Sequence, residues 1–228
     1  MAEYFNEHDQ GEAVKKWLKE NGGAILMGLV IAFGGLFGFR QWQAWEVNQQ
    51  KGAAAEFEVM SQLLAEDQLD SAMANYQTLK DDYSDSPYAS LAALQMARAR
   101  LEADQVDLAL NLYRFVMENG TPAAIQLVAR ERLARLLLDQ GEAGDALAAL
   151  EVDGKAVGFE AAFAEVRGDI HAALGQNEQA IASYQQALDA LEAGIGDRAY
   201  LELKLRSLGG VPQQPDNEVI DTQDGSQS

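Results

Sequence analysis

The chain has 228 residues, of which 36 are acidic and 17 basic, giving a formal net charge of −19 without a single cysteine. A protein this acidic repels a polyanion, which excludes nucleic acid as the partner. It favours basic or unfolded protein partners instead. The lack of cysteine excludes disulfides, thiolate metal sites and cysteine nucleophiles.

Residues 1–20 form a short polar segment, and residues 21–39 follow as an apolar run of 19 without a charge. A helix of that length covers roughly 28 Å, close to the hydrocarbon thickness of a bilayer. Basic and tryptophan side chains, typical of membrane interfaces, gather at both ends: Lys15, Lys16, Trp17, Lys19, Arg40, Trp42 and Trp45. The run therefore predicts one transmembrane helix.

This helix is expected to be an uncleaved signal anchor. The run exceeds the roughly 7 to 15 apolar residues of a cleaved signal, and bulky residues 40–42 stand where a small cleavage site belongs. Three lysines precede the span, against Arg40 and Lys51 after it, which is a slender bias toward a cytoplasmic N-terminus. Residues 1–20 are then cytoplasmic, and the rest of the chain lies across the membrane.

Small residues spaced four apart recur within the predicted span. Gly28 stands four residues from Ala24 and from Ala32, and Gly34 stands four from Gly38. This spacing lets a second spanning helix approach closely. Gly28, Gly34 and Gly38 are therefore candidate transmembrane contacts, although glycine is also common in spanning helices that have no such partner.

Residues 40–208 are predicted to be entirely helical, because alanine and leucine recur three and four positions apart. An alanine followed four residues later by a large side chain returns at intervals of 37, 37 and 34 residues: Ala72 with Tyr76, Ala109 with Tyr113, Ala146 with Leu150, and Ala180 with Tyr184. This is near the 34-residue period of tetratricopeptide repeats. The predicted fold is all-α, with one transmembrane helix followed by a tetratricopeptide-like α-solenoid.

The last unit is the best copy of that repeat. Gly168, Gly175, Ala180, Tyr184 and Ala187 match its small, turn, small, aromatic and small positions. We expect about four helix pairs, then a capping helix over residues 197–208. Residues 209–228 hold two prolines and polar acids, which predicts a disordered acidic tail.

The sequence offers little catalytic chemistry. His8 and His171 are the only histidines, and the predicted membrane separates them. Adjacent acids such as Asp81 and Asp82 are expected on a polar, solvated surface, and no phosphate-binding or nucleophile motif occurs. We predict no catalytic residue, no metal site, no cofactor and no enzyme activity.

The first helix of each tetratricopeptide pair lines an inner groove. Mixed apolar and charged positions on it suit an extended peptide or a partner helix. The candidate protein-binding residues are Leu94, Arg98, Leu101, Glu131, Arg135, Leu138, Glu165 and Asp169. Each of them also fits a merely solvated or packed position.

The N-terminal residues EYFNEHDQGEAVKKWLKENGGAILMGLVIAFGGLFGFRQWQ, with the repeat domain behind them, resemble the YfgM-type ancillary subunit of the bacterial SecYEG translocon. The resemblance is most specific in residues 12–22, at the exit of the span by Arg40 and Trp42, and in the last repeat. It implies a single-pass inner-membrane protein whose tetratricopeptide-like domain is periplasmic.

The resemblance also implies partners. They are the SecYEG translocon, a membrane-anchored periplasmic chaperone of the peptidyl-prolyl isomerase type, and unfolded client chains. The implied function is a non-enzymatic adaptor in protein transport that links emerging secretory or outer-membrane proteins to the periplasmic chaperone network. The alternative is a tetratricopeptide scaffold in another envelope process, such as outer-membrane assembly or envelope stress signalling.

Leu29→Arg should impair membrane insertion. A charge at mid-span costs about 2.5 to 3.5 kcal/mol. Carbonate extraction of membranes should release a larger fraction of this variant than of the unaltered chain. Gln43→Arg, just beyond the apolar run, is the matched control, and equal release of both variants would contradict a span over residues 21–39.

Overall fold

The computed structural model describes residues 7–152, 154, 156–191 and 196–213. Within these ranges it contains nine α-helices and no strand, which confirms the all-α prediction. The chain divides into two compact units, Met1–Ala54 and Ala55–Ser228, which are considered separately. The tail predicted beyond residue 213 lies outside the described residues.

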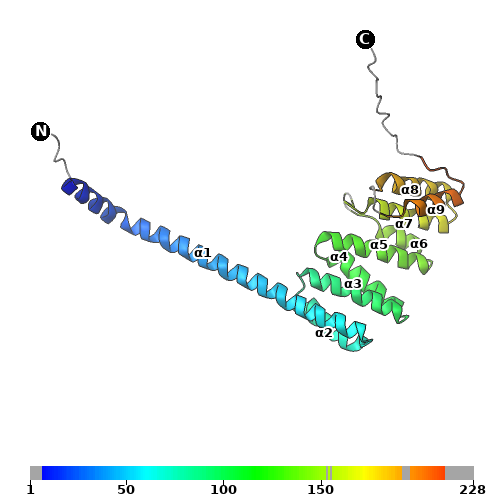
Figure 1. Cartoon of the computed structure of the whole chain (residues 1–228), viewed down its shortest axis with the longest axis horizontal. Helices are drawn as coiled ribbons and strands as arrows, with labels where there is room; N and C mark the ends of the chain where they lie inside the picture. Colours follow the sequence, from blue (N-terminus) through cyan, green and yellow to red (C-terminus); the bar gives the residue numbers. More distant parts are fainter. Residues whose placement is uncertain (1–6, 153, 155, 192–195, 214–228) are drawn as a thin grey trace, which may run out of the picture. The chain divides into compact units, whose positions relative to one another are not determined.

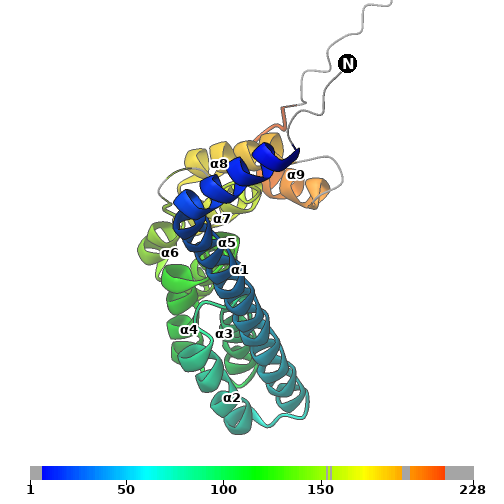
Figure 2. The same ribbon diagram turned by 90° about the vertical axis from the view of Figure 1, so that its left-hand side faces the viewer.

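The described residues of the first unit belong to one long helix, α1 (Glu7–Ala65), whose last turns are part of the second unit (Figure 1, Figure 2). The α1 helix continues past residue 39 through Arg40, and the limits of the transmembrane segment at residues 21 and 39 stay a prediction. In the described residues no single helix meets the length and hydropathy of a membrane span. The segments Lys15–Ala24 and Leu26–Ala65 reach that length and hydropathy only when taken together, as a pair bent by 45°.

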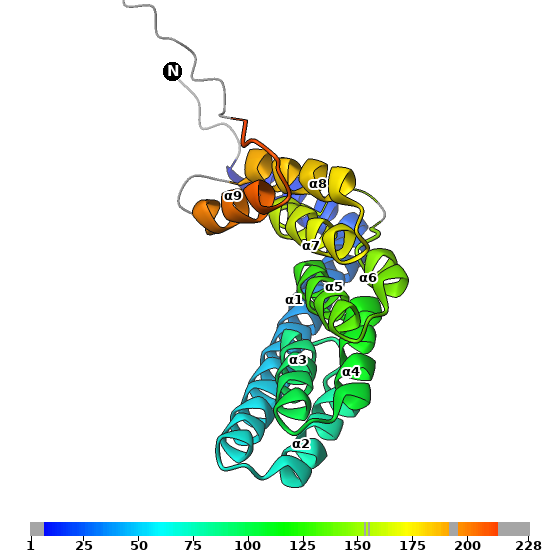
Figure 3. The same cartoon turned by 90° about the vertical axis from the view of Figure 1, so that its right-hand side faces the viewer.

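The second unit is a stack of short helices that follow one another in antiparallel pairs (Figure 3). The end of α1 pairs with α2, and the Asn75 amide donates to Glu56 at 2.8 Å between them. The further helices are α2 (Leu69–Asp82), α3 (Pro87–Glu102), α4 (Val106–Asn119), α5 (Ala123–Asp139), α6 (Ala143–Ala149), α7 (Glu160–Ala173), α8 (Asn177–Ala190) and α9 (Arg198–Ser207).

The same turn joins the two helices of every pair. Its central residue has a left-handed backbone, with φ of 57° at Asp67, 57° at Asp104, 80° at Gly141 and 70° at Gly175. Two backbone hydrogen bonds close each turn. In the last pair they run from Gly175 N to Ala172 O at 3.0 Å and from Gln176 N to His171 O at 2.8 Å. Aspartate tolerates this conformation better than most residues, which explains why only half of these turns carry glycine.

The turn occurs once more after α9. Gly209 has a φ of 86°, its N–H donates to Arg206 O, and Gly210 N donates to Leu205 O, both at 3.0 Å. Gly209 follows Gly175 by 34 residues, the spacing of a full repeat. The α9 helix therefore occupies the place of the first helix of a fifth pair. Residues 211–213, which follow it, are not helical.

The predicted repeat phase is confirmed in the core. All four alanines of the motif are fully buried, and the large residues one turn later are also buried in the core: Tyr76, Tyr113, Leu150 and Tyr184. The last pair shows why small residues are needed. A Cβ on Gly168 would lie 2.5 Å from the ring of Tyr184. The α7 and α8 helices cross at that point with no room for a side chain.

The third pair departs from the pattern because α6 has only seven residues. The Arg130 guanidinium reaches across from α5 and donates to Ala149 O at 3.1 Å and to Glu151 O at 2.7 Å. These two carbonyls stand where α6 ends, so Arg130 satisfies acceptors that a longer helix would bond internally.

Gly168→Ala should lower the free energy of unfolding by about 1 to 3 kcal/mol, because the new methyl group overpacks against the buried Tyr184 ring. Gly144→Ala is the matched control. Nothing lies within 4 Å of its added Cβ. That change should stabilise by about 0.5 kcal/mol through reduced unfolded-state entropy. Urea unfolding measures both, and a destabilisation of equal size at the two sites would contradict the tight crossing.

Candidate protein-binding surface

Three of the eight predicted groove residues are leucines, and the structure places them below or at the edge of the surface. Leu94 is only 6% exposed and belongs to the core, which corrects its assignment as a surface residue. Leu101 and Leu138 are half-buried. Their position reflects the narrow spacing of neighbouring helices, which the repeat pattern alone does not specify.

The five charged residues of the predicted set lie on the first helices of the second, third and fourth pairs. We call the surface made by Arg98, Glu131, Arg135, Glu165 and Asp169 the first-helix face. Arg98 on α3 is exposed and pairs with Glu102, four residues along its own helix, at 2.8 Å. The other four residues take part in a series of contacts that crosses from α5 to α7.

That series runs through alternating charges. Arg135 contacts Glu131 on its own helix at 3.0 Å and Glu165 on α7 at 3.9 Å. Glu165 also accepts from Lys204 on α9 at 2.7 Å, and Lys204 contacts Asp169 at 2.8 Å. The structure thus brings Glu131, Arg135, Glu165 and Asp169 together, as expected of residues on one face.

Lys204 is the residue that the sequence interpretation missed. The sequence predicts that it lies in a capping helix, and the residues of a cap are not expected to line the groove. The signal that could have found it is the 34-residue spacing from Gly175 to Gly209, which marks α9 as a further first helix. The Lys204 ammonium lies 4.7 Å from the ring centre of Tyr200 and 5.8 Å from that of Tyr184.

Tyr184 connects this charged surface to the core. Its ring packs under Gly168, and its hydroxyl donates to Asp169 Oδ1 at 2.7 Å. Burial, followed by the hydrogen bond to Asp169, raises the pKa of Tyr184. Burial alone would lower the pKa of Lys204, but its hydrogen bonds to Asp169 and Glu165 outweigh that effect, and the pKa is raised.

The equivalent tyrosines of the earlier pairs are also held protonated. Burial, with a smaller effect of the Asp81 charge, raises the pKa of Tyr76 to about 12. Burial raises the pKa of Tyr113 too, although the positive charge of Arg132 partly offsets it. Three of the four large repeat residues are thus phenols that favour the neutral form.

The charged side chains of this surface form ion pairs with one another. Among the residues that the structure describes, no three potential ligands gather to hold a metal ion. His171 Nδ1 lies 2.7 Å from Gln176 Oε1 at the repeat turn, and the His8 side chain lies outside the described set. The arrangement offers paired charges and half-buried apolar groups, which suit protein binding.

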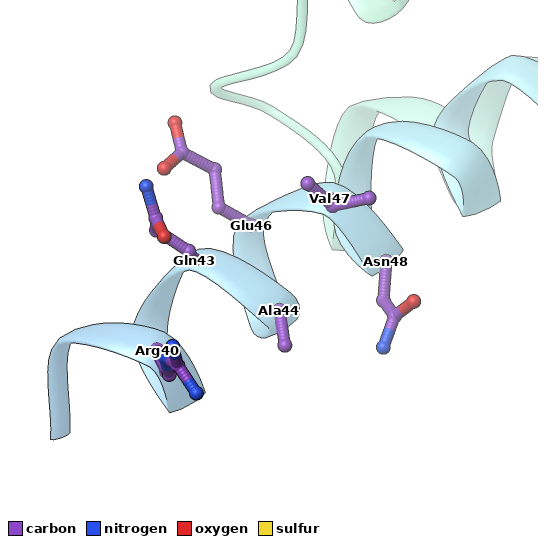
Figure 4. A pocket seen from close by; sticks show the side chains of 6 residues that line it. All are labelled: Arg40, Gln43, Ala44, Glu46, Val47 and Asn48. Carbon is purple, nitrogen blue, oxygen red and sulfur yellow. The ribbon is translucent and has the colours of Figure 1, made fainter. Parts of the chain in front are cut away.

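The predicted transmembrane contacts lie in the first unit. A Cβ added to Gly28, Gly34 or Gly38 would meet nothing within 4 Å, so these positions are open on α1. The helix becomes polar directly after the apolar run. Figure 4 shows this segment, where a shallow hollow is lined by Arg40, Gln43, Ala44, Glu46, Val47 and Asn48.

Comparisons with known proteins agree with this geometry. The family model of the tetratricopeptide repeat-like domain matches residues 15–210. An ancillary SecYEG translocon subunit from Aggregatibacter actinomycetemcomitans is 31% identical over 208 residues, covering 91% of this chain and all of the relative. Proteins of the same name from Neisseria gonorrhoeae and Escherichia coli are 29% and 28% identical, over 91% and 86% of this chain and 100% and 90% of the relatives.

Paired helices, a repeated turn and an open face of first helices define a tetratricopeptide-like solenoid built for protein binding. The match to these relatives extends over nearly their whole length, so it identifies the family more specifically than the fold does. The chain belongs to the family of ancillary SecYEG translocon subunits.

The free energy of unfolding should fall as the pH rises from about 10 to 12. Unfolded tyrosine loses its proton near its ordinary pKa of 10.0, whereas folded Tyr76 keeps it until about 12, so deprotonation favours the unfolded state. Tyr184 and Lys204, whose pKa values are also raised, act in the same direction. Urea unfolding at a series of pH values measures this dependence.

Two single variants test the contribution of Tyr184 to the free energy of unfolding. Tyr184→Phe should cost about 1.5 kcal/mol at neutral pH through loss of the hydrogen bond to Asp169, and it should flatten the decline above pH 10. Tyr200→Phe keeps the ring beside Lys204 and alters a half-exposed residue, so it should change the free energy of unfolding at neutral pH much less than Tyr184→Phe does. A free energy of unfolding that stays constant up to pH 12 would contradict the raised pKa values of these buried groups.

Proposed function

We propose that this chain is a non-enzymatic adaptor, anchored in the inner membrane, that works beside the Sec translocon through protein–protein binding. One observation carries the proposal: an uncharged run of 19 residues and a repeat solenoid occur in the same chain. The names of the relatives, ancillary SecYEG translocon subunits, support the association with the translocon.

The anchor is residues 21–39 of α1, with the N-terminus in the cytoplasm and the solenoid in the periplasm. Its large side chains are exposed on the helix, with Phe33 at 68% and Phe37 at 73%. Side chains of this kind are costly in water and stable in lipid. Gly28, Gly34 and Gly38 would let a spanning helix of the translocon pack closely against the anchor.

The first-helix face is the proposed binding surface for protein partners. Its residues differ in how readily they can exchange partners. Arg98 pairs with Glu102 at high exposure, where an ion pair is worth about 0 to 1 kcal/mol, so a partner's charge can replace either member at little cost. Glu165 and Asp169 form ion pairs with the half-buried Lys204, so they exchange partners less readily and give the surface a fixed shape.

The partners proposed for this face are a membrane-anchored periplasmic chaperone of the peptidyl-prolyl isomerase type and unfolded client chains. Extended segments fit because they present both apolar and charged groups along their length. The alternative function is a scaffold in another envelope process, such as outer-membrane assembly or stress signalling. The first-helix face suits such a scaffold as well as it suits a translocon adaptor. The identity of the captured partners distinguishes the two functions.

Photo-crosslinking side chains at Gly28, Gly34 and Arg98 should capture translocon or chaperone subunits in living cells. The same group at Glu178, an exposed position on the second helix of its pair, is the matched control and should capture much less. Capture dominated by outer-membrane assembly or stress-signalling components would support the alternative. A solenoid that external protease cannot reach in spheroplasts would overturn the periplasmic placement.

A further inference from the structure

The buried tyrosine of the second pair has a cation beside it where that of the fourth pair has an anion. When the turns of the two pairs are aligned, Tyr113 on α4 corresponds to Tyr184 on α8. Only 4% and 3% of these residues are exposed. The Tyr184 hydroxyl donates to Asp169 on α7 at 2.7 Å. In the same alignment the residue of α3 that corresponds to Asp169 is Arg98, so a donor replaces the acceptor.

A second cation reaches the Tyr113 hydroxyl from the next first helix. The α4 helix packs against both α3 and α5 (Figure 3). Arg132 on α5 donates a hydrogen bond to the Tyr113 hydroxyl. Burial raises the pKa of Tyr113, whereas the charge of Arg132, this hydrogen bond and the charge of Arg98 lower it. The two guanidinium groups thus approach one hydroxyl from neighbouring first helices.

The fourth pair carries its own counter-ion, and the second pair does so only weakly. Asp169 contacts Lys204 at 2.8 Å, and both side chains are largely buried. Arg98 contacts Glu102 at 2.8 Å, but 76% and 63% of these two side chains are exposed, so the pair exchanges partners readily. Arg132 is exposed and forms no ion pair with any residue that the structure describes.

The next arginine along this face is already engaged. Arg135 contacts Glu131 at 3.0 Å and Glu165 at 3.9 Å, so the chain's own carboxylates surround it. The unmatched positive charge is therefore confined to Arg98 and Arg132. A site of this size fits a single carboxylate rather than a run of acidic groups.

A carboxylate from outside the chain would complete the arrangement. Its oxygens would accept from both guanidinium groups, and from the Tyr113 hydroxyl as Asp169 accepts from Tyr184. With a net charge of −19, the rest of the chain disfavours acidic segments, so binding at this spot would be selective. We propose that Arg98, Arg132 and Tyr113 form a subsite for the side-chain carboxylate of a glutamate or aspartate in an extended partner segment.

This inference rests on the proposed function in one respect, the use of the first-helix face for binding. It adds the chemistry of the partner at one position. The net charge alone favours basic segments, whereas the second pair calls for an acidic residue at this point of the face.

The test uses the full-length chain in neutral detergent micelles and two short peptides of leucine, serine and glycine that carry a neutral fluorescent dye. Their ends are acetylated and amidated, and the central residue is glutamate in one and glutamine in the other. Fluorescence anisotropy should show the glutamate peptide bound at least about tenfold more tightly. Equal affinities would overturn the proposal. A stronger preference for the glutamine peptide with a free C-terminal carboxylate would also overturn it.

Variants of the chain locate the effect. Arg98→Gln/Arg132→Gln should bind the glutamate peptide at least about tenfold more weakly and the glutamine peptide unchanged. Tyr113→Phe keeps the ring and should weaken the glutamate peptide alone, by a few-fold. Lys51→Gln/Arg114→Gln is the matched control. It removes two exposed positive charges outside the first-helix face and should leave both affinities unaltered.

A loss of equal size in the control would overturn the subsite, because the preference would then reflect net charge. Circular dichroism checks folding, and if the double variant unfolds, Arg98→Gln and Arg132→Gln are measured singly, with selective weakening expected of each. Capture of translocon subunits in cells without any glutamate preference would overturn this inference alone. A glutamate preference that depends on Arg98 and Arg132, without such capture, would overturn the proposed function alone.

Discussion

The close approach of two helices at a small residue is the constraint on which the solenoid depends. Gly168 leaves no room for a Cβ beside the Tyr184 ring, and in every pair a fully buried alanine stands one turn before the large residue. A short pair of helices cannot bury its apolar face alone. The two helices of each pair must therefore pack closely, so that the next pair can cover their shared apolar face.

The same crossings organise the charged surface. Tyr184 fills the core with its ring and places its hydroxyl on Asp169, which in turn contacts Lys204 from the next helix. One side chain on α8 thus joins the packing of the fourth pair to the ionic contacts between α7 and α9. The repeat departs from its pattern at the short α6. There the Arg130 guanidinium donates hydrogen bonds to the backbone carbonyls at the helix end, which a longer helix would satisfy internally.

The repeat period extends further than the helix pairs do. The turn after α9 reproduces the earlier turns in backbone angle, hydrogen bonds and spacing, yet no second helix follows within the described residues. Glu202, paired with Arg198 and Arg206, then occupies the position that is glycine in α7. A solenoid has two ends that must face water, and a face of paired charges meets that requirement without altering the core.

The sequence by itself determined the helical class and the phase of the repeat. These follow from spacing, because residues three and four apart share one side of a helix and a period near 34 returns them to equivalent places. Residues 21–39 could also be recognised from composition alone, and their place in a membrane remains a prediction.

Only the tertiary structure decided how neighbouring helices share their side chains. It buried Leu94, which the pattern assigned to the surface, and it brought Lys204 from α9 to Glu165 and Asp169 across 39 and 35 residues of sequence. It also showed that Asp67 and Asp104 adopt the backbone of the turn glycines. The reason is physical: periodicity specifies the side of a helix, whereas burial and ion pairing depend on the distance to the next helix.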